Sequence, residues 1–335
     1  MKVSPSLLLI VLVLLGHVIH ADNPENCTVS YKKAFAIFDA SGIKLLPKSD
    51  IDKAINGFTV FYSHDENSVT KDIIDQLREG FELSMCDWNT DFSGNGAIIL
   101  PYVSHVGRLT DFAFSYSIDC FQNYRRAESC DVLLYTMTLA RRVSCDKLLV
   151  LNAVSYEQQT KGLLISRNIL NALDQQETII FYERWKKMPK TAEMADVILF
   201  ERNRFINKLK NDPVAFFRML DSTTISGGMA GYKHNANTVS DIEKKVAINK
   251  AKEVRYDLID AYYKDCSEAV ALPPRDAQSR LASLYKNIDT IESQSHITAK
   301  ILRELSPAFS VYYEQKCEFN KLESEIIDMF EKQMK

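Results

Sequence analysis

Apolar residues recur at every fourth position in several stretches of this chain, and this spacing is the feature that most limits its fold. One stretch begins at Val69 and continues through Leu77 to Met85. Residues four apart lie on one face of an α-helix, so the pattern predicts helices with one buried face. Glycine is also scarce, at 11 of 335 residues, against an average of about 7%. The sequence therefore predicts an all-α fold with at most one short pair of strands.

The composition changes between residues 222 and 239. This segment is rich in glycine, asparagine, serine and threonine, and it holds one lysine and no acidic residue. Such a composition is typical of a loop or linker. We therefore predict two helical domains, an N-terminal one over residues 22–221 and a C-terminal one over residues 240–335, joined by a polar linker over 222–239.

Helix boundaries can be placed from local signals on either side of this linker. Asp212 followed by Pro213 has the pattern of a cap and a first helical residue. In the C-terminal domain, Ser240 opens a first helix with a capping-box pattern, and the proline pair at 273–274 ends it. A second helix is predicted over 276–295 and a third from near Pro307 to the end. Three such helices would form a small antiparallel bundle.

Residues 1–21 have the pattern of a secretory signal peptide. Lys2 supplies a positive start, an uninterrupted apolar run covers residues 7–15, and Ala21 is a small residue suited to the cleavage site. The apolar run is shorter than the about 20 residues that a membrane span needs. We therefore expect a secreted, extracellular chain beginning at Asp22, without membrane insertion.

The seven cysteines are expected to form disulfides, because secreted proteins fold in an oxidising compartment. Cys266 and Cys317 can pair within the C-terminal domain, and that bridge is the best-supported single pair. Two further pairs are expected among the five N-terminal cysteines, with one thiol left over, and spacing alone leaves their pairing open. Those five are Cys27, Cys86, Cys120, Cys130 and Cys145.

Two other kinds of site have partial signals in the sequence. Asn26 begins an Asn-Cys-Thr acceptor pattern and is the candidate glycosylation site. The run from Asp87 to Ser93 resembles the start of a calcium-binding loop, but Phe92 and Ile98 stand where that loop needs glycine and glutamate. The spacing of histidines and cysteines does not match a zinc site. We therefore predict no metal and no other cofactor.

The chain also lacks the sequence patterns of common catalytic sites. It has no Gly-x-Ser-x-Gly elbow and no phosphate-binding loop, so we expect no enzymatic activity. Its net charge is −3, whereas nucleic-acid-binding proteins usually carry a basic surplus. The basic stretch 184–190 is read as a solvated helix end rather than a polyanion site. Protein binding, favoured by the many tyrosines, is the function class that remains.

The layout of the chain resembles the 34 kDa secreted salivary protein family of culicine mosquitoes. The likeness rests on the leader, the run from Cys27 to Phe35, the five early cysteines, the polar segment near Gly227, and a helical end with Cys266 and Cys317. The resemblance implies an all-helical, two-domain protein without enzymatic activity, delivered in saliva to assist blood feeding. It also implies that the N-terminal domain binds a cuticular protein of the feeding mouthparts.

Two alternatives remain open: the protein binds a host plasma or immune protein, or it scavenges small host mediators. Odorant-binding-like scavengers usually carry two cysteines separated by three residues. The closest pair here is Cys120 and Cys130, so the chain departs from that pattern at its most specific point. The oligomeric state and the residues that contact a partner are left undetermined by the sequence.

Overall fold

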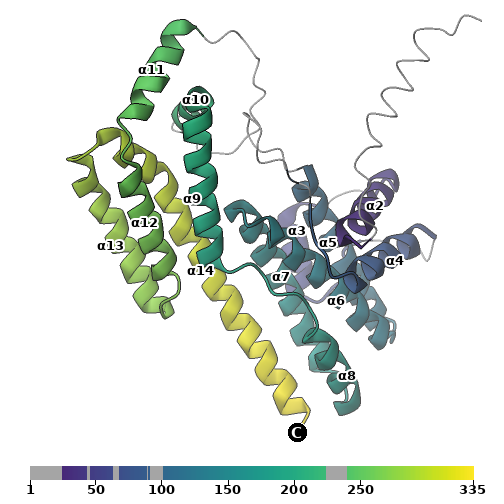
Figure 1. Ribbon diagram of the computed structural model, residues 1–335. Helices are drawn as coiled ribbons and strands as arrows, with labels where there is room; N and C mark the ends of the chain where they lie inside the picture. The colour runs from purple at the N-terminus through teal and green to yellow at the C-terminus, as the bar shows by residue number, and fades with distance from the viewer. Residues whose placement is uncertain (1–24, 44–45, 63–67, 89, 91–100, 224–239) are drawn as a thin grey trace, which may run out of the picture.

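The structure is a computed structural model that describes residues 25–43, 46–62, 68–88, 90, 101–223 and 240–335. Within these ranges it consists of α-helices and one short 3-10 helix, and it contains no strand (Figure 1). A single parallel bridge between Asn26 and Met85 is the one β-type contact among them. The all-α prediction is therefore confirmed.

The helices fall into two groups along the chain. The first group comprises α2 (Cys27–Ala40), α3 (Lys48–Asn56), α4 (Ser68–Glu82), α5 (Pro101–Gln122), α6 (Arg126–Arg142), the 3-10 helix η1 (Val143–Asp146), α7 (Leu149–Leu170) and α8 (Gln175–Trp185). The second group comprises α9 (Met194–Asn211), α10 (Pro213–Thr223), α11 (Asp241–Lys252), α12 (Tyr256–Ala269), α13 (Pro274–Glu292) and α14 (His296–Gln333).

Local signals explain where several of these helices begin. The side chain of Asp212 accepts a hydrogen bond from the amide of Ala215 at 3.0 Å, and α10 begins at Pro213 as predicted. At α8, Asp174 and Glu177 form a complete capping box. Such caps satisfy backbone amides that have no partner within the first helical turn.

Helices on both sides of the predicted linker contribute to one hydrophobic cluster. Helices α9 and α10 pack with α11 to α14 in one apolar cluster, which includes Phe216 and Tyr263. The predicted N-terminal domain, residues 22–221, includes α9 and most of α10. A second cluster lies among α2, α4, α5 and α6. The two-domain division itself stays a prediction.

The last helix joins the two groups. Helix α14 is 38 residues long and runs through Pro307, so the predicted start near Pro307 is wrong. Its first half packs in the α9–α13 cluster through Phe309, while Phe319 and Phe330 pack in a third cluster with residues of α6, α7 and α8. Figure 1 shows α14 running from the α12–α13 helices toward α8. Packing on both sides outweighs the one backbone hydrogen bond that a proline removes.

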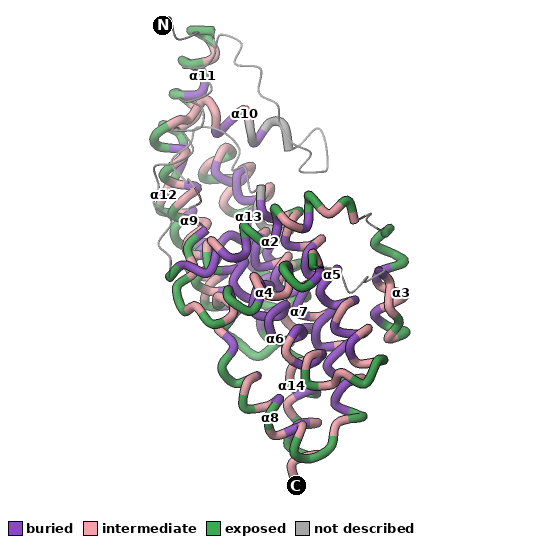
Figure 2. The backbone as a smooth tube through the Cα atoms, turned by 90° about the vertical axis from the view of Figure 1, so that its right-hand side faces the viewer, coloured by how far each residue is buried: buried purple, intermediate pink, exposed green. Residues whose placement is uncertain are grey.

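The C-terminal region therefore has four helices where three were expected. Residues 253–255 separate α11 from α12, and α11 is largely exposed at one end of the molecule (Figure 2). Residues 1–21, predicted as a signal peptide, and residues 224–239 of the predicted linker lie outside the described residues, whereas positions 222–223 belong to α10. Within the described ranges, none of the helices has the length and apolar character of a membrane span.

Candidate functional site: a polar groove beside α4, α5 and α6

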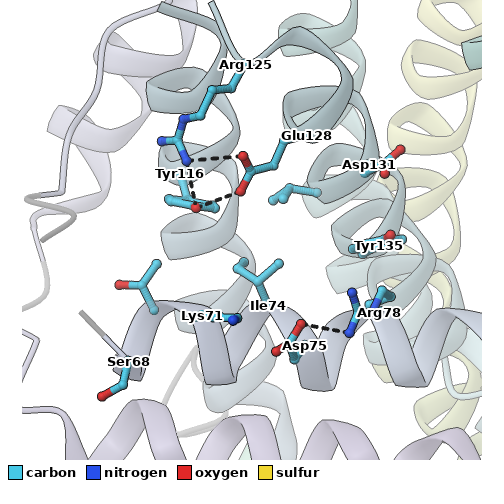
Figure 3. Close-up of a pocket in the computed structure, with 12 residues that line it drawn as sticks. Ser68, Lys71, Ile74, Asp75, Arg78, Tyr116, Arg125, Glu128, Asp131 and Tyr135 are labelled. Atoms are coloured by element: carbon cyan, nitrogen blue, oxygen red, sulfur yellow. Dashed lines mark hydrogen bonds and ion pairs between the residues drawn. The ribbon is translucent and has the colours of Figure 1, made fainter. Parts of the chain in front are cut away.

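A groove of about 500 Å³ lies between two walls (Figure 3). Helix α4 is on one side, and the end of α5 and the following helix α6 are on the other. The groove's volume falls within the range of about 300–1,000 Å³ that is common for ligand pockets. The lining residues are Ser68, Thr70, Lys71, Ile74, Asp75, Arg78, Tyr116, Arg125, Glu128, Asp131, Val132 and Tyr135.

One wall of the groove is organised around Arg125. Its guanidinium donates to the Tyr116 hydroxyl and to the Glu128 carboxylate, each at 3.2 Å, and lies over the Tyr116 ring. The Tyr116 hydroxyl donates to Glu128 at 2.9 Å. The turn that positions Arg125 contains Tyr124 with φ of 62° and closes when the Arg125 amide donates to the Cys120 carbonyl at 2.8 Å. These three side chains thus form a preorganised polar cluster.

The opposite wall is the outer face of α4. Asp75 and Arg78 form an ion pair at 2.9 Å, and the exposed side chain of Lys71 lies one turn before Asp75. An exposed pair of this kind stabilises a helix by less than about 1 kcal/mol. Its members can therefore exchange their intramolecular pairing for contacts with a ligand at little cost.

The floor of the groove is apolar, and one end is closed by a further ion pair. Val132 and Tyr135 are buried beneath the polar walls. Asp131 pairs with Arg184 of α8, whose guanidinium also lies over the Tyr135 ring. The basic stretch 184–190 is therefore partly turned inward, and Lys186 within it pairs with Glu183.

The charges lining the groove balance. Three cationic side chains face three carboxylates, counted from the lining residues. Burial raises the pKa of both Tyr116 and Tyr135, so both phenols are neutral near pH 7 and available for hydrogen bonding. A groove with this mixture suits a ligand that carries both polar and apolar groups, such as a segment of polypeptide.

The cysteines, which were expected to form disulfides, are unpaired in the structure. All seven cysteines are free thiols in the structure, so the predicted Cys266–Cys317 bridge is not formed in it. Cys266 is buried within the α9–α14 cluster, whereas Cys317 packs only at the edge of that cluster. Cys120 and Cys130 are buried in α5 and α6. The remaining three cysteines lie together near Arg142.

Asn26, the candidate glycosylation site, is a structural cap in this fold. It is 2% exposed. Its side-chain oxygen accepts from the amides of Thr28 and Asp87, and its nitrogen donates to the Asp87 carbonyl at 2.7 Å. The nitrogen that would carry a glycan is therefore enclosed. Glycosylation at Asn26 stays a prediction, and its burial argues against it.

Among the described residues, no group of three or more histidine, cysteine or acidic side chains is arranged to hold a metal ion. Most of the run from Asp87 to Ser93, including its last three residues, lies outside the described residues. His105, which is described, pairs with Asp39 at 2.9 Å. The sequence alone does not reveal the groove, because Arg125 and Glu128 have the pattern of an ordinary surface pair until the fold places Tyr116 beside them.

No protein-family model, no curated protein and no solved structure matches this chain.

Proposed function

We propose that this protein is a secreted, non-enzymatic binding protein that holds a segment of a partner protein in the groove between α4 and α6. The observation that carries the proposal is the Tyr116–Arg125–Glu128 cluster, which stands over an apolar floor. Tyrosine and arginine are the residue types that contribute most to protein interfaces. Ordered side chains also reduce the entropy that is lost on binding.

The groove also lacks the composition of a common catalytic site. Its lining residues include neither histidine nor cysteine, which most often serve as general bases or nucleophiles. Its carboxylates Asp75, Glu128 and Asp131 are paired with arginines. Binding is thus the simpler use of this arrangement.

The resemblance noted above suggests the partner, a cuticular protein of the feeding mouthparts, with delivery in saliva. A host plasma or immune protein is the second candidate. Scavenging of small mediators is the third candidate, because the groove's volume of about 500 Å³ also fits a small ligand, whereas the more apolar hollow beside Cys130, Phe181 and Leu134 has a volume of about 190 Å³. That volume is below the usual lower limit of about 300 Å³ for a ligand pocket.

The test is a capture experiment with matched variants. The chain without residues 1–21 is immobilised and exposed separately to mouthpart cuticle extract and to vertebrate plasma, and retained proteins are identified by mass. The groove variant carries Lys71→Glu with Arg78→Glu, and the control carries Lys32→Glu with Lys33→Glu on the exposed face of α2. Both variants change the net charge equally.

We expect one saturable partner whose affinity falls at least about tenfold, or 1.4 kcal/mol, in the groove variant and less than about twofold in the control. Equal binding by both variants would remove the groove from the proposal. If both extracts yield no partner and native mass spectrometry finds a bound small molecule, the scavenger alternative replaces protein binding.

A further inference from the structure

Three cysteines that are distant in the sequence meet beside one buried arginine. Cys27 is the first residue of α2, Cys86 follows α4, and Cys145 lies in η1. The amide of Cys27 donates to the Met85 carbonyl at 3.0 Å, which places Cys86 next to Cys27. The Cys86 thiol lies 3.6 Å from the carbonyl oxygen of Arg142, three residues before Cys145.

Cys86 lies between the other two thiols. Hydrogen bonding with the other two thiols raises the pKa of Cys86 and lowers the pKa of Cys27 and of Cys145. The segment that carries Cys86 is held against Arg142 by a second hydrogen bond. The Trp88 indole donates to the same Arg142 carbonyl at 3.0 Å. A disulfide requires two of these sulfur atoms to approach to about 2.05 Å.

The guanidinium of Arg142 is fixed beside these thiols. It donates to the Tyr31 hydroxyl at 3.1 Å and to the carbonyl oxygens of Gly80 and Leu83. The hydrogen bond with Cys86 and the charge of Arg142 lower the pKa of Cys27 and of Cys145, against the opposing effect of burial. Thiolates are the reactive form of cysteine, so both outer cysteines are poised to react.

The three residues differ in access. Cys27 is fully buried, Cys86 is half-buried and Cys145 is exposed. A reagent from solvent therefore reaches Cys145 first. Cys27 in addition lies at the N-terminus of α2, where the helix dipole favours a negative charge.

We propose that Cys27, Cys86 and Cys145 form a thiol–disulfide exchange site, in which Cys145 is the entry thiol and Cys86 is always one half of the protein disulfide. Because three thiols cannot all pair, the cluster also accounts for an odd cysteine. The resting product is the Cys27–Cys86 disulfide, with Cys145 left as an exposed thiol.

The oxidant is a small disulfide such as oxidised glutathione. The Cys145 thiolate attacks one of its sulfurs, forms a mixed disulfide and releases one glutathione thiolate. Cys86 loses its proton to solvent and attacks the Cys145 sulfur, which forms Cys86–Cys145 and releases the second glutathione thiolate. Cys27 then attacks the Cys86 sulfur and displaces the Cys145 thiolate. In total, two protein thiols lose two electrons and two protons, and the oxidised glutathione becomes two thiols.

The test uses the reduced protein, without residues 1–21, treated with oxidised glutathione. Remaining thiols are blocked with an alkylating reagent, and disulfides are mapped by peptide mass spectrometry. We expect Cys86 bonded to Cys27 and Cys145 alkylated. In the Cys27→Ser variant, oxidation should stop at the Cys86–Cys145 disulfide. The Cys86→Ser variant should retain glutathione bonded to Cys145. In Cys145→Ser, the Cys27–Cys86 bond should form at least about tenfold more slowly, because the accessible thiol is missing.

Cys120→Ser is the matched control, since Cys120 is a buried cysteine of α5, and it should change none of these rates more than about twofold. The wild-type map alone tests the proposal if a variant does not fold. A Cys27–Cys145 bond, or Cys86 alkylated in the oxidised protein, would overturn it.

Discussion

The guanidinium of Arg141 on α6 donates to the carboxylate of Glu323 on α14 at 2.6 Å, across 182 positions of sequence. Arg141 is buried, and it also donates to the side chain of Gln159 at 2.9 Å and to the Pro189 carbonyl at 3.1 Å. One side chain thus connects α6, α7, the segment before α9 and α14. This contact secures the second half of α14 to the N-terminal helices.

Removing the Glu323 charge should therefore destabilise the protein. Breaking a buried ion pair costs about 3–5 kcal/mol, but the Glu323 side chain is 27% exposed, and hydration offsets part of the loss. We expect Glu323→Gln to lower the free energy of unfolding by about 1–3 kcal/mol in urea titrations. Glu268→Gln, which affects an exposed pair with Lys264, should cost less than about 0.5 kcal/mol. Equal effects of the two substitutions would contradict this role.

Two glycines should respond to alanine in opposite ways. A Cβ at Gly80 would lie 2.3 Å from a ring carbon of Tyr31, whereas a Cβ at Gly107 would meet only a side-chain atom of Gln158 at 3.9 Å. We expect Gly80→Ala to destabilise by about 1–3 kcal/mol or more through overpacking. Gly107→Ala should stabilise by about 0.4–1 kcal/mol, because alanine loses less entropy in a helix. Thermal or urea unfolding would measure both, and a neutral Gly80→Ala would show that Tyr31 can move.

Asn26 should matter as a cap and not as a glycan carrier. Its side chain joins the start of α2 to Asp87 through hydrogen bonds with both of its polar atoms. Asn26→Ala should cost about 1–2 kcal/mol of stability, and Asn26→Asp should cost less because it retains the accepting oxygen. Protein from secreting cells should keep its mass after treatment with a glycosidase that removes Asn-linked sugars. A mass decrease that Asn26→Asp abolishes would show that the cap forms only in unglycosylated chains.

The Glu292 carboxylate, at the turn between α13 and α14, should contribute less to the stability of the protein in acid. Hydrogen bonds from Arg303 and His296 lower the pKa of Glu292 from 4.5 to about 2. Because the folded pKa lies below the unfolded one, the stabilisation is present above pH 4.5 and is lost as the pH falls from there through about 2. In urea unfolding between pH 6 and pH 2, Glu292→Gln should show a shallower loss of stability than the wild type. The control Glu331→Gln, at an exposed position of α14, should follow the wild-type curve.

The features that could be predicted from the sequence are those that neighbouring residues specify. The four-residue spacing from Val69 predicted a helix that the structure shows as α4, with Ile73 and Leu77 buried. Asp212 and Pro213 predicted the start of α10. Periodicity and capping act within one or two turns of a helix, so a single sequence contains their signal in full.

Which helix faces meet was decided only by the tertiary structure. Phe309 and Phe330 belong to one continuous helix, yet they pack in different clusters, and nothing in their local pattern distinguishes them. The same holds for Tyr116 beside Arg125 and for the meeting of Cys27, Cys86 and Cys145. By itself, the sequence determined the all-α class and local boundaries such as the start of α10, because these follow from short-range hydrogen bonding. Only the tertiary structure decided the groove and the thiol cluster, because each depends on side chains brought together by packing between helices that are distant in the chain.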